Sequence, residues 1–208
     1  PSDSLPSFSK ILMAQSPQRI RADEVLPSST ASFLSLSISN PDKYFEDYHS
    51  FLRSLGKYTP YHNTLQSLNN AYGFRLPDDF TEIMDQEITL AFDSPRRADS
   101  SPDVYILLRT KSKSQAEAQL KSMLEKIGAI DKKSPETYTS KYNFDAELSF
   151  NIYYFPVHQL LSKVYGNLFS ALDQHYFILL DNYLVFSGSE NALKYLIQNY
   201  ILNKTLQN

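Results

Sequence analysis

Apolar and polar positions repeat along the chain with two different periods. From residue 33 to 38, Leu and Ile alternate mainly with Ser, which is the period of a half-buried strand. Asn40 then offers an N-cap oxygen, Pro41 suits a first helical position, and Gly56 suits the left-handed residue beyond a helix end. The pattern therefore predicts a strand followed by an amphipathic helix. The apolar stripe of this helix consists of Tyr44, Phe45, Tyr48, Phe51, Leu52 and Leu55.

The same order of strand, capping residue and amphipathic helix recurs at 104–128 and at 183–202. Both copies contain a Ser followed three positions later by a Glu, which is the spacing of a capping box at a helix start. We expect Gly128 to close the helix of the first of these copies. The capping pairs are Ser114 with Glu117 and Ser187 with Glu190.

Other runs predict the elements between these copies. They are a helix over 61–73, a short helix over 76–86, strands over 87–93 and 103–110, one long or two short strands over 142–155, a helix from 157 that either ends at Gly166 or continues to Leu172, and a hairpin turning at Asp181 and Asn182. Strands thus come as neighbouring pairs with a helix after each pair. We therefore expect an α+β domain over 23–208, with a mixed or mostly antiparallel sheet, helices packed on one face, and repeated strand-pair plus helix units.

Residues 1–22 follow no sustained period and carry three prolines and five serines. This composition predicts a flexible N-terminal arm or linker, although Phe8, Ile11 and Leu12 would allow it to lie against the domain. The chain starts at Pro1 and stops abruptly after a helix pattern, so we expect it to be part of a longer protein with a signal peptide or lipid anchor before Pro1.

Composition narrows the classes of function. The chain has 208 residues, of which 42% are hydrophobic and 21% charged, and its net charge is −3, which is typical of a folded globular domain. No basic stripe is present, so we expect no nucleic-acid partner. The absence of cysteine excludes thiol nucleophiles, thiolate metal sites and disulfides. No apolar run reaches the roughly 18 residues of a membrane span, so any membrane contact is expected only through the absent N-terminal anchor.

Two further features resemble chemical motifs. Gly188 stands between a strand and a helix, as in phosphate-binding loops, but it is a single glycine without a following Lys-Ser, and Glu190 would repel an anion. The histidines show neither H-x-x-x-H nor H-E-x-x-H spacing, so we interpret them as structural. They are His49, His62, His158 and His175.

The densest carboxylate group lies around the short helix predicted at 76–86. Its members are Asp78, Asp79, Glu82, Asp85 and Glu87. Glu82 and Asp85 would share a helix face and offer oxygens to a calcium ion, but Asp78 and Asp79 also suit a helix start, so a solvated acidic face is favoured. The sequence thus predicts no catalytic residue, no cofactor and no metal.

Tyrosine is the one over-represented residue, with 15 copies and no tryptophan. Tyr58, Tyr61 and Tyr72 flank predicted helix ends. Because tyrosine combines a large apolar ring with a hydroxyl, these three form our candidate binding surface.

Two stretches of the chain resemble an uncharacterised family of Bacteroides-type bacterial envelope proteins. These are "VLPSSTASFLSLSISNPDKY" and "LLSKVYGNLFSALDQHYFILLDNYLVFSGSENALKYLIQNY". Members are similar to lipoproteins or membrane-anchored proteins of unknown function, and the likeness covers about a third of the chain. It implies an extracytoplasmic, cell-envelope location (periplasm or outer-membrane anchor) and offers no catalytic residue. The matching positions are Gly166, Phe169, Tyr176, Asp181, Tyr183, Leu184, Val185, Phe186, Ser189, Ala192 and Leu193.

These observations favour a noncatalytic binding or interaction module of the bacterial envelope. Its partner would be a protein or another domain of the same chain. Two alternatives stay open: a protein that binds a glycan or small ligand through Tyr58, Tyr61 and neighbouring polar groups, and a hydrolase whose Asp, Glu or His site is assembled only in space.

Overall fold

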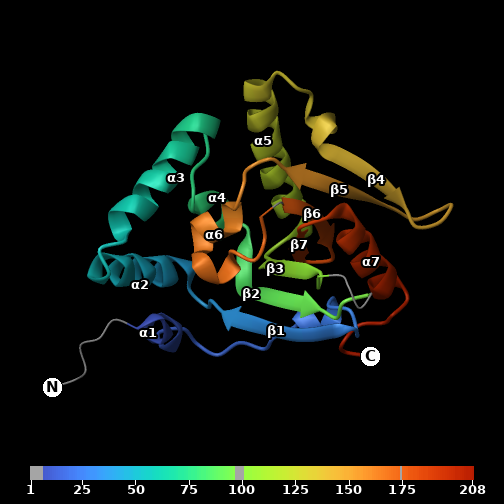
Figure 1. Ribbon diagram of the computed structural model, residues 1–208, viewed down its shortest axis with the longest axis horizontal. Helices are drawn as coiled ribbons and strands as arrows, with labels where there is room; N and C mark the ends of the chain where they lie inside the picture. The colour runs from blue at the N-terminus through green and yellow to red at the C-terminus, as the bar shows by residue number, and fades with distance from the viewer. Residues whose placement is uncertain (1–6, 97–100, 174) are drawn as a thin grey trace.

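The chain folds around one seven-stranded antiparallel sheet with the strand order β1-β2-β3-β7-β6-β5-β4 (Figure 1). The computed structural model describes residues 7–96, 101–173 and 175–208. Its strands are β1 (Thr30–Ser37), β2 (Met84–Asp93), β3 (Val104–Thr110), β4 (Thr139–Asn143), β5 (Ser149–Phe155), β6 (His175–Leu180) and β7 (Tyr183–Ser187). The predicted α+β class is confirmed.

Helices follow pairs of strands along the chain, in the predicted order. The described α-helices are α1 (Phe8–Met13), α2 (Pro41–Ser54), α3 (Tyr58–Tyr72), α4 (Asp78–Thr81), α5 (Lys113–Asp131), α6 (Leu160–Tyr165) and α7 (Glu190–Ile201), with short 3-10 helices η1 (Ala22–Glu24), η2 (Pro135–Tyr138) and η3 (Asn167–Phe169). Three strand pairs are each followed by a helix: β2-β3-α5, β4-β5-α6 and β6-β7-α7. The repeated strand-pair plus helix unit is therefore confirmed.

Both faces of the sheet are apolar and both are covered. On β3, Ile106 and Leu108 contribute to the larger core, while Tyr105 and Leu107 contribute to the smaller one. Helices α1 to α6 pack on the larger core, whereas α7 and η1 cover the smaller (Figure 1). We expected helices on one face only. The arrangement differs because the central strand β7 is buried at every position, so each of its faces needs a covering layer.

Helix starts differ from the predicted capping boxes. The side chain of Ser112 accepts from the backbone N–H of Gln115, and that of Ser189 accepts from Ala192, so these two residues are the N-caps. Ser187 still belongs to β7 and donates its hydroxyl to the Val104 carbonyl at 2.8 Å. The two predicted capping boxes, Ser114 with Glu117 and Ser187 with Glu190, are therefore wrong. Helix α5 begins two residues earlier than the first box requires, and helix α7 begins two residues later than the second box requires.

Two other predicted helix ends also move. Gly128 lies inside α5, which continues to Asp131, and a Cβ at Gly128 would lie 2.7 Å from the Lys133 carbonyl oxygen. A glycine is needed there for close approach of the chain and not for closing the helix. Helix α4 ends at Thr81, so Glu82 and Asp85 do not share a helix face as expected. By contrast, Asn40 caps α2 and Gly56 is left-handed, as predicted.

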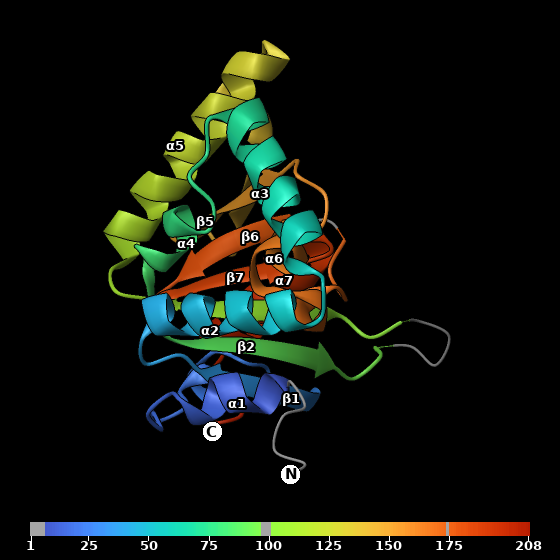
Figure 2. The ribbon, with the colours of Figure 1, turned by 90° about the vertical axis from the view of Figure 1, so that its left-hand side faces the viewer.

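The described part of the N-terminal arm packs against the domain. Ile11 of α1 is 3% exposed and α1 lies next to α2 (Figure 2). Further along, the backbone N–H groups of Arg21 and Ala22 donate to the buried carboxylate of Glu87 at 3.0 and 3.1 Å. None of the described helices combines the length and apolar character that a membrane crossing requires.

Candidate functional site

An apolar groove of about 800 Å³ opens on the side of the molecule where α1 and β1 lie below α2, and α3 and α6 lie above it (Figure 2). We call it the tyrosine groove. Its walls consist of Phe8, Leu12, Leu34, Leu36, Tyr48, Phe51, Leu52, Leu55, Lys57, Pro60, Tyr61, Thr64, Gln159, Ser162, Lys163, Tyr165, Gly166, Asn167 and Leu168. Four separate stretches of the chain, 8–12, 34–36, 48–64 and 159–168, thus meet at one concave surface of a size typical for small-ligand sites.

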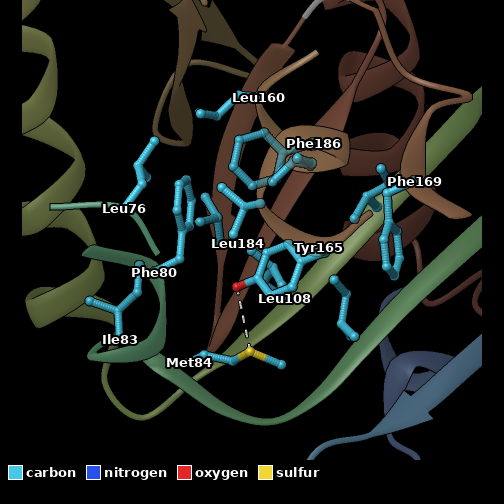
Figure 3. Packing of buried hydrophobic residues seen from close by; sticks show 14 of the residues in the cluster. Leu76, Phe80, Ile83, Met84, Leu108, Leu160, Tyr165, Phe169, Leu184 and Phe186 are labelled. Carbon is cyan, nitrogen blue, oxygen red and sulfur yellow. Dashed lines mark hydrogen bonds between the residues drawn. The ribbon is translucent and has the colours of Figure 1, made fainter. Parts of the chain in front are cut away.

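Three tyrosines give the groove its inner surface. Tyr61 donates its hydroxyl to the Val164 carbonyl at 3.2 Å, which holds the start of α3 against α6. Tyr165 donates to the Met84 sulfur at 3.5 Å and so stays anchored in the core beneath the groove (Figure 3). The rings of Tyr48 and Tyr61 meet edge to face at 5.6 Å. These contacts hold the aromatic walls in defined orientations.

Two tyrosine hydroxyls in this region have no hydrogen-bond partner among the described residues. Tyr48 lines the groove, and its hydroxyl lies against Gly166. Tyr44, whose ring stacks on Tyr48 at 6.1 Å, is 0% exposed, and its hydroxyl is buried without a partner. Tyr44 does not belong to the groove lining, so of these two hydroxyls only that of Tyr48 belongs to a residue that a ligand in the groove would meet.

Gly166 shapes one wall of the groove. It has φ +96° and ψ 175°, a conformation that residues with a Cβ rarely adopt, and it ends α6 before η3 begins. Of the two predicted alternatives, the interruption at Gly166 is therefore the correct one. A Cβ at this position would overlap the Tyr48 hydroxyl and lie 3.1 Å from Cζ of the same ring.

The ionisable groups that line the groove are tyrosines and lysines. Burial raises the pKa values of Tyr48 and Tyr61, so both phenols are neutral near pH 7 and act as hydrogen-bonding groups. Burial lowers the pKa of Lys163, whose ammonium donates to the His158 carbonyl. Lys57 is exposed at the rim, and no carboxylate belongs to the lining.

The structure separates the three tyrosines of the candidate binding surface. Tyr61 lines the groove. Tyr58 is one turn away, with Arg53 over its ring at 4.1 Å, and Tyr72 stacks on Phe74 at 5.2 Å near the far end of α3. Only Tyr61 of the predicted set therefore contributes to the groove. The helical repeat places all three tyrosines on one side of α3, but Tyr72 lies about three turns farther along the helix than Tyr61.

Three carboxylates of the group predicted around α4, those of Asp79, Glu82 and Asp85, are already engaged by protein partners. Asp79 is 0% exposed and accepts from the Arg75 backbone and from Gln119, both at 2.8 Å. Glu82 forms a two-pronged pair with Arg75 at 2.8 and 3.0 Å, and Asp85 lies 3.2 Å from Arg109. Within the described ranges, no group of three or more acidic or histidine side chains has an arrangement suited to a metal ion.

The histidines take structural positions. His49 and His62 pack against the ring of Tyr58 at 5.3 and 5.6 Å. His158 lies 3.7 Å from Asp173, but both side chains are more than half exposed and neither lines the groove. This pair therefore does not form a histidine–carboxylate site in a concave pocket.

Two buried polar side chains belong to the scaffold. Glu87 is 3% exposed, and its carboxylate accepts hydrogen bonds from Arg21, Ala22, Ser35, Thr89 and Tyr183. This full set of donors ties the N-terminal segment to β1, β2 and β7. His175 is 0% exposed, and neither of its ring nitrogens has a partner among the described residues.

Sequence reasoning missed most of the groove. Leu34, Leu55 and Leu168 are 47%, 42% and 36% exposed around it, but in the sequence they continue ordinary strand and helix patterns. Lys163 belongs to no motif, and Gly166 stands out in the sequence only as a possible helix end and as a position of the family resemblance. Exposed apolar residues become informative only when the fold gathers them on one concave surface.

The fold and the groove together define an α+β protein with an apolar pocket rimmed by lysine. Comparison of the chain with family models, curated proteins and solved structures found no match.

Proposed function

We propose that this protein is a noncatalytic binding module whose ligand occupies the tyrosine groove. The observation that carries the proposal is the gathering of Leu34, Leu55 and Leu168, each at least 36% exposed, around one cavity of about 800 Å³. Covering such side chains contributes about 25 cal/mol per Å² of apolar surface removed from water. An apolar ligand therefore gains binding energy here without any rearrangement of the core.

The chemistry of the lining supports binding over catalysis. Its phenols are neutral and held by their own contacts, and no carboxylate in the lining is available as a general base. Hydroxyl, amide and ammonium groups at the rim suit orientation of a ligand. An extracytoplasmic, cell-envelope setting is part of the proposal and rests on the family resemblance of the sequence.

A titration with an apolar fluorescent probe, N-phenyl-1-naphthylamine, tests this function. We expect saturable binding to the 208-residue chain, weakened about tenfold or more by Leu55→Gln combined with Leu168→Gln. Leu202→Gln is the matched control, because Leu202 is 54% exposed at the end of α7 and lies outside the groove. Equal probe affinity in all three proteins, or no saturable binding, would contradict the proposal.

A second candidate function, protein interaction, is favoured by the outer edge of β1. β1 ends the sheet, spans eight residues without a charged side chain, and exposes 42% of Phe33. The other edge, β4, is shorter and carries Lys141, a common protection against unwanted pairing. Because the β1 sequence has no charge to repel its own copy, we propose antiparallel pairing with β1 of a second copy as the occupant.

Sedimentation equilibrium tests this pairing directly. We expect a concentration-dependent dimer that Phe33→Lys abolishes, because a charge at the edge would oppose its own copy across the pair. Leu148→Lys, at a side chain that is 39% exposed between β4 and β5, should leave the dimer intact. A monomer at all concentrations, or a dimer unaffected by Phe33→Lys, rules out this candidate.

A further inference from the structure

The charged side chains of the tyrosine groove lie at one end of it, and the opposite end is apolar. The end formed by α1 and β1 presents only apolar side chains to it, among them Leu12 and Leu34. At the other end, the hydrogen bond between Tyr61 and Val164 joins the first turn of α3 to α6. Both lysines of the lining belong to this second end, since Lys57 directly precedes α3 and Lys163 directly precedes Val164 in α6.

The positive charge at this end is not balanced within the lining. The nearby carboxylate, Asp173, accepts from Gln159 Nε2 at 2.8 Å and lies 3.7 Å from His158 Nε2. Its side chain is 64% exposed and lies outside the groove. Lys163 uses one N–H on the His158 carbonyl, and an ammonium has three donors, so two remain for a ligand.

Two further features favour an anion at the same end. Helix α3 has 15 residues, no side chain caps its N-terminus, and its first turn contains no acidic residue, so its positive dipole end is unopposed. Partial burial lowers the pKa of Lys163, because it removes water from the charged ammonium. A bound anion would compensate the ammonium for this lost hydration.

We propose that the ligand of the tyrosine groove is a single-chain amphiphilic acid. Its alkyl chain lies toward α1 and β1, and its carboxylate lies against Lys163 and Lys57. A volume of about 800 Å³ suits one chain better than the two chains of a phospholipid. This inference rests on the proposed function and adds the chemical class of the ligand to it.

A series of ligands with the same chain length tests the inference by displacement of N-phenyl-1-naphthylamine. We expect dodecanoate to bind at least tenfold more tightly than dodecanol, and dodecylammonium to bind least. Lys163→Gln should weaken dodecanoate about tenfold and leave dodecanol unchanged, whereas Lys163→Arg should keep the preference for the acid. Lys141→Gln on β4 is the control and should change neither ligand.

The possible outcomes distinguish the inference, recognition of an acid, from the proposed function, binding of an apolar ligand in the groove. Equal affinities for dodecanoate and dodecanol, with the probe still displaced, overturn acid recognition but leave the groove as an apolar binding site. A preference for dodecyl phosphate over dodecanoate overturns the carboxylate assignment. Equal weakening of both ligands in Lys163→Gln, at unchanged thermal stability, shows a structural role for Lys163 and also overturns the inference. Failure of every ligand and of the probe itself removes the proposed function as well.

Discussion

At the scale of single residues, two glycines that the sequence analysis singled out, Gly166 and Gly188, differ in how far their surroundings restrict a side chain. Gly166 combines φ +96° with a close neighbour, the Tyr48 hydroxyl, which a Cβ would overlap. Gly188, which in the sequence resembles part of a phosphate loop, has ordinary φ, and a Cβ there would meet only Leu172 at 3.7 Å. Glycine is therefore required by the backbone and its neighbours at Gly166 but not at Gly188.

Replacement of these glycines gives a matched pair of predictions. Gly166→Ala should lower the free energy of unfolding by about 1–3 kcal/mol, because a Cβ is strained at positive φ and collides with Tyr48. The variant should also bind the apolar probe more weakly, since Tyr48 must move. Gly188→Ala should change stability by less than about 0.5 kcal/mol.

Urea unfolding of the two glycine variants is the measurement. Adding Tyr48→Phe to Gly166→Ala should recover part of the loss by removing the overlapping hydroxyl. Equal stability of the two single variants would show that Gly166 is not constrained as the structure indicates.

At the scale of elements, the sequence was a good guide to which segments are helices and strands and a poorer guide to their ends. Asn40, Pro41 and Gly56 mark α2 correctly, because capping depends on local backbone geometry. The capping boxes failed because several serines lie close together, and the tertiary structure decides which one faces the helix start. Ser187 remains in β7, where its hydroxyl bonds Val104 of the neighbouring strand.

The candidate site was much less accessible from the sequence than the elements were. Tyrosine suits binding surfaces, which predicts a role for Tyr61, and Tyr61 does line the groove. The same argument predicts Tyr58 and Tyr72, yet Arg53 lies over the ring of Tyr58 and Phe74 stacks on Tyr72. Helical spacing predicts that the three side chains share one side of the helix, but not which part of that side borders a cavity formed with other segments.

At the scale of the whole molecule, stability should depend on the protonation of His175. Its pKa is lowered from 6.5 to about 4 because burial disfavours the imidazolium, and Lys163 and His158 add like charge nearby, opposed by Asp173. Between pH 6.5 and about pH 4, the unfolded chain therefore binds a proton at this position that the folded protein does not. The contribution of neutral His175 to the free energy of unfolding is fully present above pH 6.5. It decreases by about 3 kcal/mol as the pH falls from 6.5 to about 4.

Urea unfolding at pH 7 and pH 4.5 checks this expectation. The wild-type protein should lose more stability between the two values than His175→Phe, in which the titrating group is absent. His62→Gln serves as the control, because His62 is exposed on α3 and is not among the groups that shift the pKa of His175. The same loss in His175→Phe and in the wild-type protein would assign the pH dependence to other groups.

The sequence by itself determined the class of fold, the strand-pair and helix units, and the segments that form them. Hydrophobic period, capping residues and turn residues act over a few neighbouring positions, so one chain segment contains the necessary information. Three other features emerge from the packing of the folded chain: both faces of the sheet are covered, Gly166 lies against the Tyr48 hydroxyl, and Lys57 and Lys163 share one end of an apolar groove. These relations join residues about 100 positions apart in the chain. They depend on packing of the whole core, which no local pattern specifies.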